Sequence, residues 1–314
     1  MKLPTLSDIQ SAHKRIKPFI HRTPVFTSQQ LNRIFGCELF LKCENFQKVG
    51  AFKFRGAINA VLSLSEDQKR HGVVTHSSGN HAAALALAAA MNGIKAFIVM
   101  PENAPSVKKD AVAGYCAEIT FCKPTLKSRE ETCRLIMENK GATLIHPYNN
   151  FNVICGQGTA SLELLEERSD LDIIVAPVGG GGLLSGTSTC VKAINDRVTV
   201  FGAEPLNAND AWKSFKNGIL TPSVNPVTVA DGLLTSLCEL TFMIIRNNVD
   251  DILTVKEESI ISSMKLVWER MKIIIEPSSA TVLAVIKENP ELFRGKKTGL
   301  IISGGNVDLK KLPF

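Results

Sequence analysis

Short apolar runs alternate with helix-like stretches along almost the whole chain. The runs are rich in Val and Ile and end in Gly, Pro or Ser, which is typical of buried parallel strands. We expect strands at 72–78, 96–101, 117–122, 143–147, 172–179, 198–205 and 298–306. Between them, apolar positions at helical spacing predict helices at 80–92, 105–115, 127–140, 156–167, 183–195, 257–272 and 278–288. This alternation predicts an α/β fold of open, mostly parallel twisted sheets flanked by helices.

The spacing of these elements predicts two domains, which a chain of 314 residues can form. The four strands between residues 72 and 147 make a compact block. We interpret it as a small α/β domain over 69–149, inserted into a large cofactor-binding domain made of 1–68 and 150–314. The segment 205–235 is the least periodic part of the chain and predicts a long irregular excursion.

Composition narrows the class of protein. Hydrophobic residues make up 45% and charged residues 21%, as in ordinary globular proteins, and the net charge of +6 is spread along the chain. That spread favours small anionic ligands over nucleic acid. The eight cysteines show no C-x-x-C pair and no grouping with histidine, which favours free thiols in a reducing compartment. No signal-peptide stretch and no apolar run of about 18 residues is present. We therefore expect a cytoplasmic protein that does not bind membranes.

Three Gly/Ser-rich segments follow predicted strands: "SSGNH" (77–81), "GGGG" (179–182) and "SGGN" (303–306). In open α/β sheets, ligands bind beyond the carboxyl ends of the strands. Backbone N–H groups of Gly179, Gly180, Gly181 and Gly182, backed by a helix start, can form a concave anion site. The sequence is no Walker motif and lacks a ribose-binding acid at the right spacing, so a small phosphate-bearing cofactor fits better than a nucleotide. A flexible linker is the alternative.

The stretch "VGAFKFRGA" places Lys53 between Phe52 and Phe54. A lysine amine removed from water has a lowered pKa and can form a Schiff base, although an ordinary surface lysine is the alternative. Polar groups of "SSGNH" point at a ligand or simply cap a helix. For His81, a packed helix residue is an equally good interpretation.

Five motifs occur in order: "GAFKFRGA", "SSGNHAAA", "GGGGLLSG", "EPLNAND" and "LIISGGNVD". Together they resemble the serine racemase and serine/threonine dehydratase group of fold-type II pyridoxal phosphate enzymes, whose fold is like that of the tryptophan synthase β chain. The resemblance extends from "HRTPVFTS" (21–28) to "SGGNVDL", which is nearly the whole chain.

The resemblance implies a role for each matching position around pyridoxal phosphate. Lys53 resembles the lysine that holds the cofactor covalently and moves the Cα proton on one face. Phe52 is similar to the residue that lies against the cofactor ring, and Asn80 to the partner of its phenolic oxygen. Ser303 resembles the partner of the pyridine nitrogen, where a serine leaves the ring a milder electron sink than an aspartate would. The glycine loop and Leu183 resemble the phosphate site.

Ser78 is the position that bears most on the choice of reaction. Serine racemases resemble this chain in having Ser-Ser-Gly-Asn-His, whereas threonine dehydratases typically have alanine where Ser78 stands. A hydroxyl across the cofactor from Lys53 supplies a second acid/base, which racemisation requires. Similar hydroxyaspartate dehydratases also carry this sequence, so Ser78 leaves both reactions open.

Other positions are implied for substrate. Ser77, Asn80 and His81 are candidates for binding the substrate carboxylate. Arg129 and Ser236 match positions that close over substrates in the racemases, although Arg129 can equally be a surface ion-pair partner.

"AEPLNAND" carries a candidate metal site, formed by Glu204, Asp210 and the Ala208 carbonyl. These hard oxygen ligands suit Mg²⁺, Ca²⁺ or Mn²⁺ in a structural or activating role. Spacing alone leaves a solvated acidic turn as the alternative.

The chain departs from the racemases at three positions. Tyr148 stands where an asparagine is common, Ala83 replaces a glutamine that contacts ATP in animal racemases, and Val49 replaces a threonine there. The candidate nucleotide residues Lys48, Tyr115 and Asn306 are retained, which keeps ATP as a candidate activator.

These observations predict a homodimeric serine racemase that uses pyridoxal phosphate. It would interconvert L- and D-serine and also eliminate water from serine, giving pyruvate and ammonia. The alternative enzyme is a dehydratase of threo-3-hydroxyaspartate, L-serine or L-threonine without significant racemisation. A non-catalytic cofactor-binding protein is a third hypothesis, and retention of Lys53, Ser78 and Ser303 argues against it.

Overall fold

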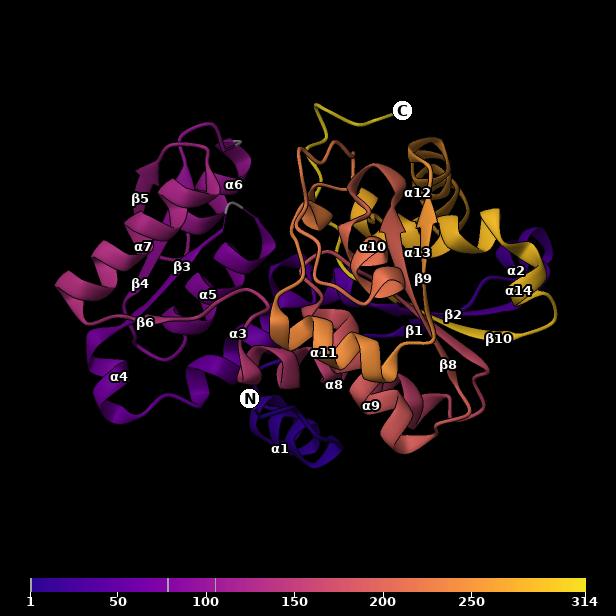
Figure 1. Ribbon diagram of the computed structural model, residues 1–314, viewed down its shortest axis with the longest axis horizontal. Coiled ribbons are helices and arrows are strands. Elements are labelled where there is room, and N and C mark those ends of the chain that lie inside the picture. Colours follow the sequence, from indigo (N-terminus) through magenta and orange to yellow (C-terminus); the bar gives the residue numbers. More distant parts are fainter. Residues whose placement is uncertain (1, 78, 105) are drawn as a thin grey trace.

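The computed structural model describes residues 2–77, 79–104 and 106–314. Two separate sheets lie side by side, each with helices on both faces (Figure 1). Among the described strands every pairing is parallel except that between β1 and β2. The expected α/β fold with mostly parallel sheets is confirmed.

The larger sheet has six strands. Their order is β1 (Val25–Phe26), β2 (Glu38–Cys43), β10 (Lys297–Ile302), β7 (Ile173–Pro177), β8 (Thr199–Pro205) and β9 (Asp251–Val255). Alternate residues of β7 pack on opposite faces: Ile173 and Val175 lie in the core beneath α12 and α13, while Ile174 and Ala176 lie in the core beneath α8 and α9. Burial on both faces explains why such a strand is a continuous apolar run.

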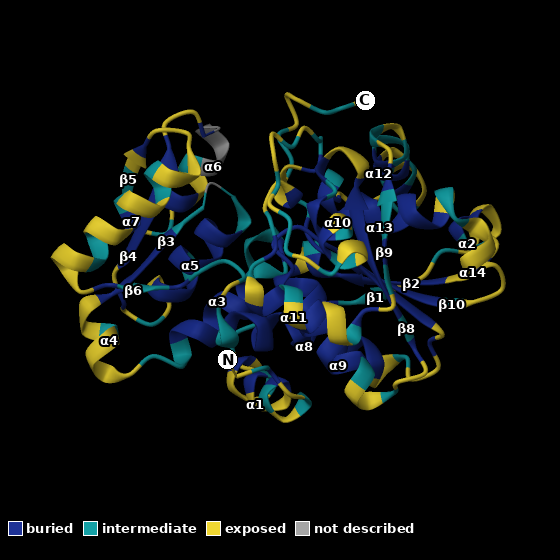
Figure 2. Cartoon of the chain, in the orientation of Figure 1, coloured by how far each residue is buried: buried dark blue, intermediate teal, exposed yellow. Residues whose placement is uncertain are grey.

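Helices of different length surround this sheet. They are α1 (Leu6–Ile16), α2 (Gln29–Phe35), α3 (Lys53–Leu62), α8 (Phe151–Glu167), α9 (Gly182–Ile194), α10 (Asp210–Asn217), α11 (Glu239–Asn248), α12 (Glu257–Met271), α13 (Pro277–Glu288) and α14 (Pro290–Phe293). Figure 2 shows α8, α9 and α13 largely in the dark blue of buried residues.

The smaller sheet has four strands in the order β5 (Glu118–Cys122), β4 (Ala96–Pro101), β3 (Val73–His76) and β6 (Thr143–Leu144). Helices α5 (Asn80–Ala90) and α6 (Ser106–Ala113) pack together, and α7 (Leu126–Lys140) contacts β3, β4 and β5. The short α4 (Glu66–His71) precedes β3 and is mostly exposed (Figure 2). These strands pair only with one another among the described residues, but the expected domain boundaries stay a prediction.

Some elements were not expected from the pattern. Strands β1, β2 and β9 and several helices, α3 among them, lay outside the predicted elements. The segment 205–235, expected to be a long excursion with little periodicity, contains one helix that was not expected, α10 at residues 210–217. Asp210 lies in the first turn of that helix, where a negative charge is favourable. The rest of the segment holds only short 3-10 turns within the described chain.

No helix in the described part of the chain is long and apolar enough to cross a bilayer. All eight cysteines are free thiols. Burial raises the pKa of Cys37 to about 11 and that of Cys43, Cys133, Cys155 and Cys190 to about 12. Cys116, by contrast, is exposed.

Glycines allow the central helices to approach closely. A Cβ at Gly186 of α9 would lie 2.5 Å from the backbone nitrogen of Gly158 and 2.6 Å from the carbonyl oxygen of Ile154, both on α8. A Cβ at Gly156 would lie 2.5 Å from the Arg55 carbonyl oxygen on α3. Backbone atoms cannot rotate away, so these positions set the spacing of α3, α8 and α9.

We expect Gly186→Ala to lower the free energy of unfolding by at least about 1 kcal/mol, because overpacking costs more than alanine's helix propensity returns. Urea unfolding followed by circular dichroism measures this. The control is Gly114→Ala, where the nearest atom to an added Cβ is 3.4 Å away. Equal stability of the two variants would contradict the close-approach argument.

Candidate active site

Lys53 lies where the chain pairs with the end of strand β10. The Phe52 N–H donates to the Ser303 carbonyl oxygen (2.9 Å), and the Gly305 N–H donates to the Gly50 carbonyl oxygen (2.9 Å). An isolated bridge pairs Ala51 with residue 304 between them. Helix α3 starts immediately afterwards at Lys53. Two motifs separated by about 250 positions in the sequence are therefore neighbours in the fold.

The Lys53 amine is in an environment that disfavours its charge. It is half-buried, donates to the Pro147 carbonyl oxygen at 3.1 Å and lies 5.0 Å from the centre of the Phe52 ring. Burial lowers the pKa of Lys53 to about 8, although the nearby Glu276 carboxylate counters part of that shift. A neutral amine is consequently accessible near neutral pH, as a nucleophile or base requires.

The glycine loop connects β7 to α9 and is packed too tightly for side chains. A Cβ at Gly180 would collide with the Tyr148 ring, and one at Gly181 would lie 2.6 Å from the Leu237 side chain. Gly181 also has a left-handed φ of 84°. Helix α9 begins at Gly182 with no side-chain cap among the described residues. Its first N–H groups therefore suit an anion such as a phosphate.

Helix α5 also begins without a side-chain cap from the described residues, and its N-terminus carries the "SSGNH" motif. The Ser77 hydroxyl accepts a hydrogen bond from the Gly79 N–H (3.3 Å). His81 is buried and lies with Nε2 3.0 Å from the Ile145 carbonyl oxygen, so Nε2 carries the donated proton. Burial lowers the pKa of His81 to about 3, which makes it a neutral residue. Ser78 lies outside the described residues.

Asn80, expected to bind the cofactor, and Asn306, a candidate nucleotide residue, contact each other. The Asn306 amide donates to Asn80 Oδ1 (2.9 Å) and to the Val49 carbonyl oxygen (2.7 Å). Asn80 Nδ2 donates in turn to both carboxylate oxygens of Glu276, at 3.0 and 3.1 Å. Asn80 of the "SSGNH" motif therefore has a carboxylate partner, Glu276, which sequence reasoning missed.

Other functional neighbours were also missed. The Ser279 and Ser303 hydroxyl oxygens are 3.0 Å apart, and Ser279 Oγ also accepts from the Gly304 N–H (2.8 Å). Glu276 and Ser279 belong to "EPSSA" (276–280), which overlaps the start of the predicted helix at 278–288, and a proline at a helix start was the available signal.

Two histidines next to the site were missed as well. The rings of His76 and His146 are 5.4 Å apart, and His146 and Tyr148 are 4.6 Å apart, both edge to face. His146 Nδ1 accepts from the Asn149 N–H at 2.9 Å, which leaves the proton on Nε2. Burial lowers the pKa of His146 to about 3 and also lowers that of His76. Both imidazoles are neutral.

The remaining predicted residues are more scattered. Ser236 Oγ accepts the Ser223 N–H (2.7 Å). Arg129 is half-buried, and its Nε has no hydrogen-bond partner among the described residues. Lys48 Nζ lies 5.7 Å from the centre of the Phe54 ring, and Tyr115 packs against the core of the small sheet.

The candidate metal ligands are two buried carboxylates. Glu204 accepts the N–H groups of Ala211 (2.8 Å) and Trp212 (2.7 Å), and burial raises its pKa well above the usual range. The Asp210 carboxylate is buried, and the nearby Ser223 side chain and Leu237 backbone offset only part of the effect of burial on its pKa. Burial raises the pKa of Asp210 to about 6. No three His, Cys, Asp or Glu side chains gather into a metal site in the described ranges, so a cation here would also need carbonyl or water ligands.

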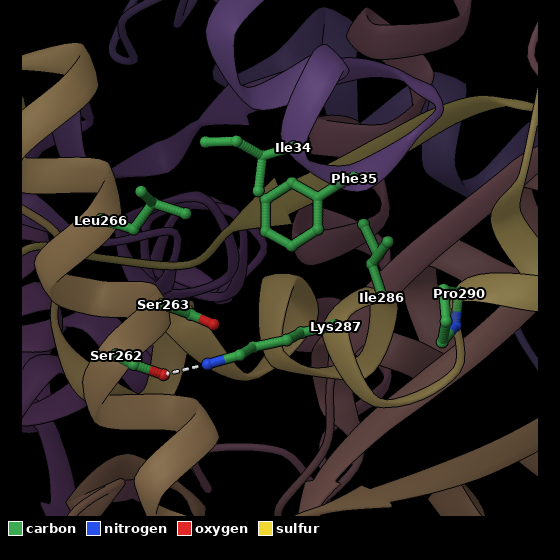
Figure 3. Close-up of a pocket in the computed structure, with 8 residues that line it drawn as sticks. All are labelled: Ile34, Phe35, Ser262, Ser263, Leu266, Ile286, Lys287 and Pro290. Atoms are coloured by element: carbon green, nitrogen blue, oxygen red, sulfur yellow. Dashed lines mark hydrogen bonds between the residues drawn. The ribbon is translucent and has the colours of Figure 1, made fainter.

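A separate hollow of about 150 Å³ opens near the far end of α13, and Figure 3 shows its lining. Its lining residues are Ile34, Phe35, Ser262, Ser263, Leu266, Ile286, Lys287 and Pro290. The predicted site residues within the described chain are absent from this lining, so we do not assign the reaction to it.

Comparison with known proteins agrees with this geometry. Residues 16–304 match the family model described as pyridoxal-phosphate dependent enzyme. The chain is 53% identical over 313 residues to serine racemase of Dictyostelium discoideum (98% of this chain, 96% of the relative). It is 50% identical to β-hydroxyaspartate dehydratase of Paracoccus denitrificans, over the full length of both.

A solved structure of serine racemase from Dictyostelium discoideum superposes with a TM-score of 0.93 at 54% identity, covering 97% of this chain and 99% of that one. The family match and the identity above one half show that the chain belongs to the fold-type II pyridoxal-phosphate dependent enzymes.

Proposed function

We propose that this protein is a serine racemase that also dehydrates serine, with pyridoxal phosphate bound at Lys53. The observation that carries the proposal is the Lys53 amine, whose pKa is lowered to about 8 and which donates to the Pro147 carbonyl oxygen; the next residue, Tyr148, packs against the glycine loop. The sequence identity of 53% to a serine racemase, over nearly the whole chain, supports the same reaction class.

The residues present fit the cofactor. The N–H groups of Gly179 to Gly182 and of Leu183 would bind its phosphate, because the start of α9 has no side-chain cap among the described residues. Phe52 would lie against its ring, Asn80 would bind the phenolic oxygen, and Ser303 would face the pyridine nitrogen. When bound, the cofactor supplies an electron sink that weakens the bonds at the substrate Cα.

Lys53 and Ser78 would move the Cα proton. Lys53 would remove it from one face, since its amine is neutral at slightly alkaline pH. Ser78 would return a proton to the opposite face, which inverts the centre. The start of α5, with Ser77, Asn80 and His81, would hold the substrate carboxylate.

Glu276 and Asn306 would orient the Asn80 amide through the hydrogen bonds described above. Arg129 and Ser236 would close over the bound amino acid. In the dehydration branch, Lys53 would remove the Cα proton, the β-hydroxyl would leave as water, and hydrolysis of the unsaturated product would give pyruvate and ammonia.

Dehydration of threo-3-hydroxyaspartate is the second candidate function. It is favoured by the dehydratase relative at 50% identity and by the Arg129 Nε, a buried donor without a partner in the described chain, which suits a second carboxylate.

We also propose that Glu204, Asp210 and the Ala208 carbonyl bind a divalent cation in a structural or activating role. Mg²⁺ is the preferred candidate. Two adjacent buried carboxylates with raised pKa values support this, because a cation removes their repulsion. Activation by ATP through Lys48, Tyr115 and Asn306, the homodimeric state, the cytoplasmic location and the domain boundaries stay predictions.

The proposed function predicts two products. Incubation with L-serine, pyridoxal phosphate and Mg²⁺ should give D-serine and pyruvate, quantified together by chromatography. Lys53→Ala should abolish both. Ser78→Ala should lower D-serine formation about 100-fold or more, since general acid/base groups contribute that much, while pyruvate from L-serine persists.

The control is Ser169→Ala, an exposed serine outside the site. Unchanged D-serine formation in Ser78→Ala would refute the role of Ser78. Pyruvate without D-serine from the unaltered protein would instead indicate the dehydratase.

The Lys53 environment predicts its titration. In the cofactor-free protein, labelling of Lys53 by trace acetic anhydride should have a midpoint near pH 8, against about 10.4 for an ordinary lysine. Glu276→Gln should lower that midpoint further, because it removes a charge that stabilises the ammonium form. Peptide mass spectrometry measures both, with exposed Lys310 as the internal control. A midpoint near pH 10 for Lys53 would contradict the argument.

The buried carboxylate pair, Glu204 and Asp210, predicts that a divalent cation stabilises the folded protein. A carboxyl with a raised pKa stabilises the fold when protonated, so this stability is lost as pH rises through about 6 for Asp210. At pH 8, Mg²⁺ should raise the Tm by several degrees, and Asp210→Asn should remove that response while exposed Asp196→Asn retains it. A response of equal size in Asp210→Asn would place the cation elsewhere.

A further inference from the structure

Beneath the site, behind Lys53, lies a cluster of buried charges that the proposed reaction does not use. We call it the Arg55 cluster; its members are Thr23, Lys42, Glu44, Arg55, Thr159 and Glu163. Each of these residues is at most 2% exposed. The two cations and two carboxylates are in direct contact.

Arg55 is the centre of the cluster. Its Nε and Nη2 donate to the two carboxylate oxygens of Glu44, at 2.7 and 2.8 Å. Its Nη1 and Nη2 donate to the two oxygens of Glu163 on α8, at 2.9 and 2.8 Å. A planar guanidinium is the side chain that can bind two carboxylates in this double fork.

The Arg55–Glu44 pair closes a segment of chain that contains Lys53. Glu44 follows β2 directly, and Arg55 lies in the first turn of α3, so the whole stretch between them is held at both ends. Within that stretch, Val49 has a φ of 57°, which is unfavourable for a β-branched residue. Such a conformation persists when the surroundings fix it.

The second ion pair fixes this segment to the large domain. Glu163 also accepts from Lys42 Nζ (2.6 Å), which in turn donates to the Thr23 carbonyl oxygen (2.7 Å). Lys53 and Arg55 are two residues apart, about 200° around the helix. The amine therefore faces the Pro147 carbonyl oxygen, while the guanidinium lies on the other side of the helix and bonds Glu44 after β2 and Glu163 on α8.

Buried ion networks are poor devices for stability, since well-packed apolar side chains often serve as well. In some proteins they fix geometry instead, because a buried charge that loses its partner is strongly destabilising. The balanced charges of this cluster, aimed away from the site, fit that purpose.

We propose that Arg55 is a positioning residue that fixes the first turn of α3, and with it the Lys53 amine, through its double fork to Glu44 and Glu163. The proposal rests on the proposed function in taking Lys53 as the reacting group. The proposal predicts that weakening the Arg55 hydrogen bonds displaces the Lys53 amine, while the site still binds cofactor and substrate.

The test is Arg55→Lys, which keeps the charge but cannot form two forks. In the holoenzyme with L-serine we expect kcat for D-serine and pyruvate to fall about 100-fold, the loss typical of a misplaced reacting group, with KM changed only a few-fold. In the cofactor-free protein we expect the Lys53 labelling midpoint to move from near pH 8 towards that of an exposed lysine. A merely stabilising role would not move this midpoint.

The matched control is Arg22→Lys. Arg22 donates to Glu166, also on α8, at 2.7 Å, but this pair is exposed. The Arg22→Lys substitution should leave kcat and the pH midpoint of Lys53 labelling unchanged. If Arg55→Lys does not fold, Glu44→Gln, which keeps the side-chain shape, is measured in the same way.

A lowered Tm with unchanged kcat and unchanged Lys53 midpoint would overturn the proposal, since the cluster would then serve stability alone. If the unaltered protein makes neither product, the proposed function fails, but the labelling comparison still decides whether Arg55 positions Lys53.

Discussion

The backbone pairing of residues 50–52 with 303–305 is the constraint on which the site depends. It joins the turn before α3 to the turn after β10, and so places Lys53, at the start of α3, directly after the residue that pairs with Ser303. Main-chain hydrogen bonds of this kind do not depend on side-chain rotamers. The position of Lys53 is thereby set by main-chain pairing with the end of a central strand.

Two helix starts complete that arrangement. Helices α5 and α9 begin without side-chain caps from the described residues, one after each sheet, and their first N–H groups need acceptors. A helix end left open in this way costs stability unless a ligand or water satisfies it. These two helix starts therefore suit the anionic groups of the proposed function, the phosphate of the cofactor and the carboxylate of the amino acid.

The sequence predicted what depends on local pattern. The glycine loop could be found because a Val/Ile strand, four glycines and a helix are consecutive, and Lys53 because its neighbours are aromatic. Strand β2 was missed since Lys42 interrupts its apolar run. That lysine is buried only because it pairs with Glu163, 121 positions away. Glu276 was missed for the same reason, as its partner Asn80 is 196 positions distant. Helix α10 is short and lies in a segment without clear periodicity.

The distribution of thiols has a practical consequence. Five buried cysteines have pKa values raised to about 11 or 12, so they stay protonated and unreactive at neutral pH. Cys116, at the end of the connection into β5, is the exposed one. A maleimide dye would consequently attach first at Cys116 on the smaller sheet. Energy transfer between that dye and a bound coloured cofactor would then report the distance between Cys116 and the cofactor in the chain with its natural sequence.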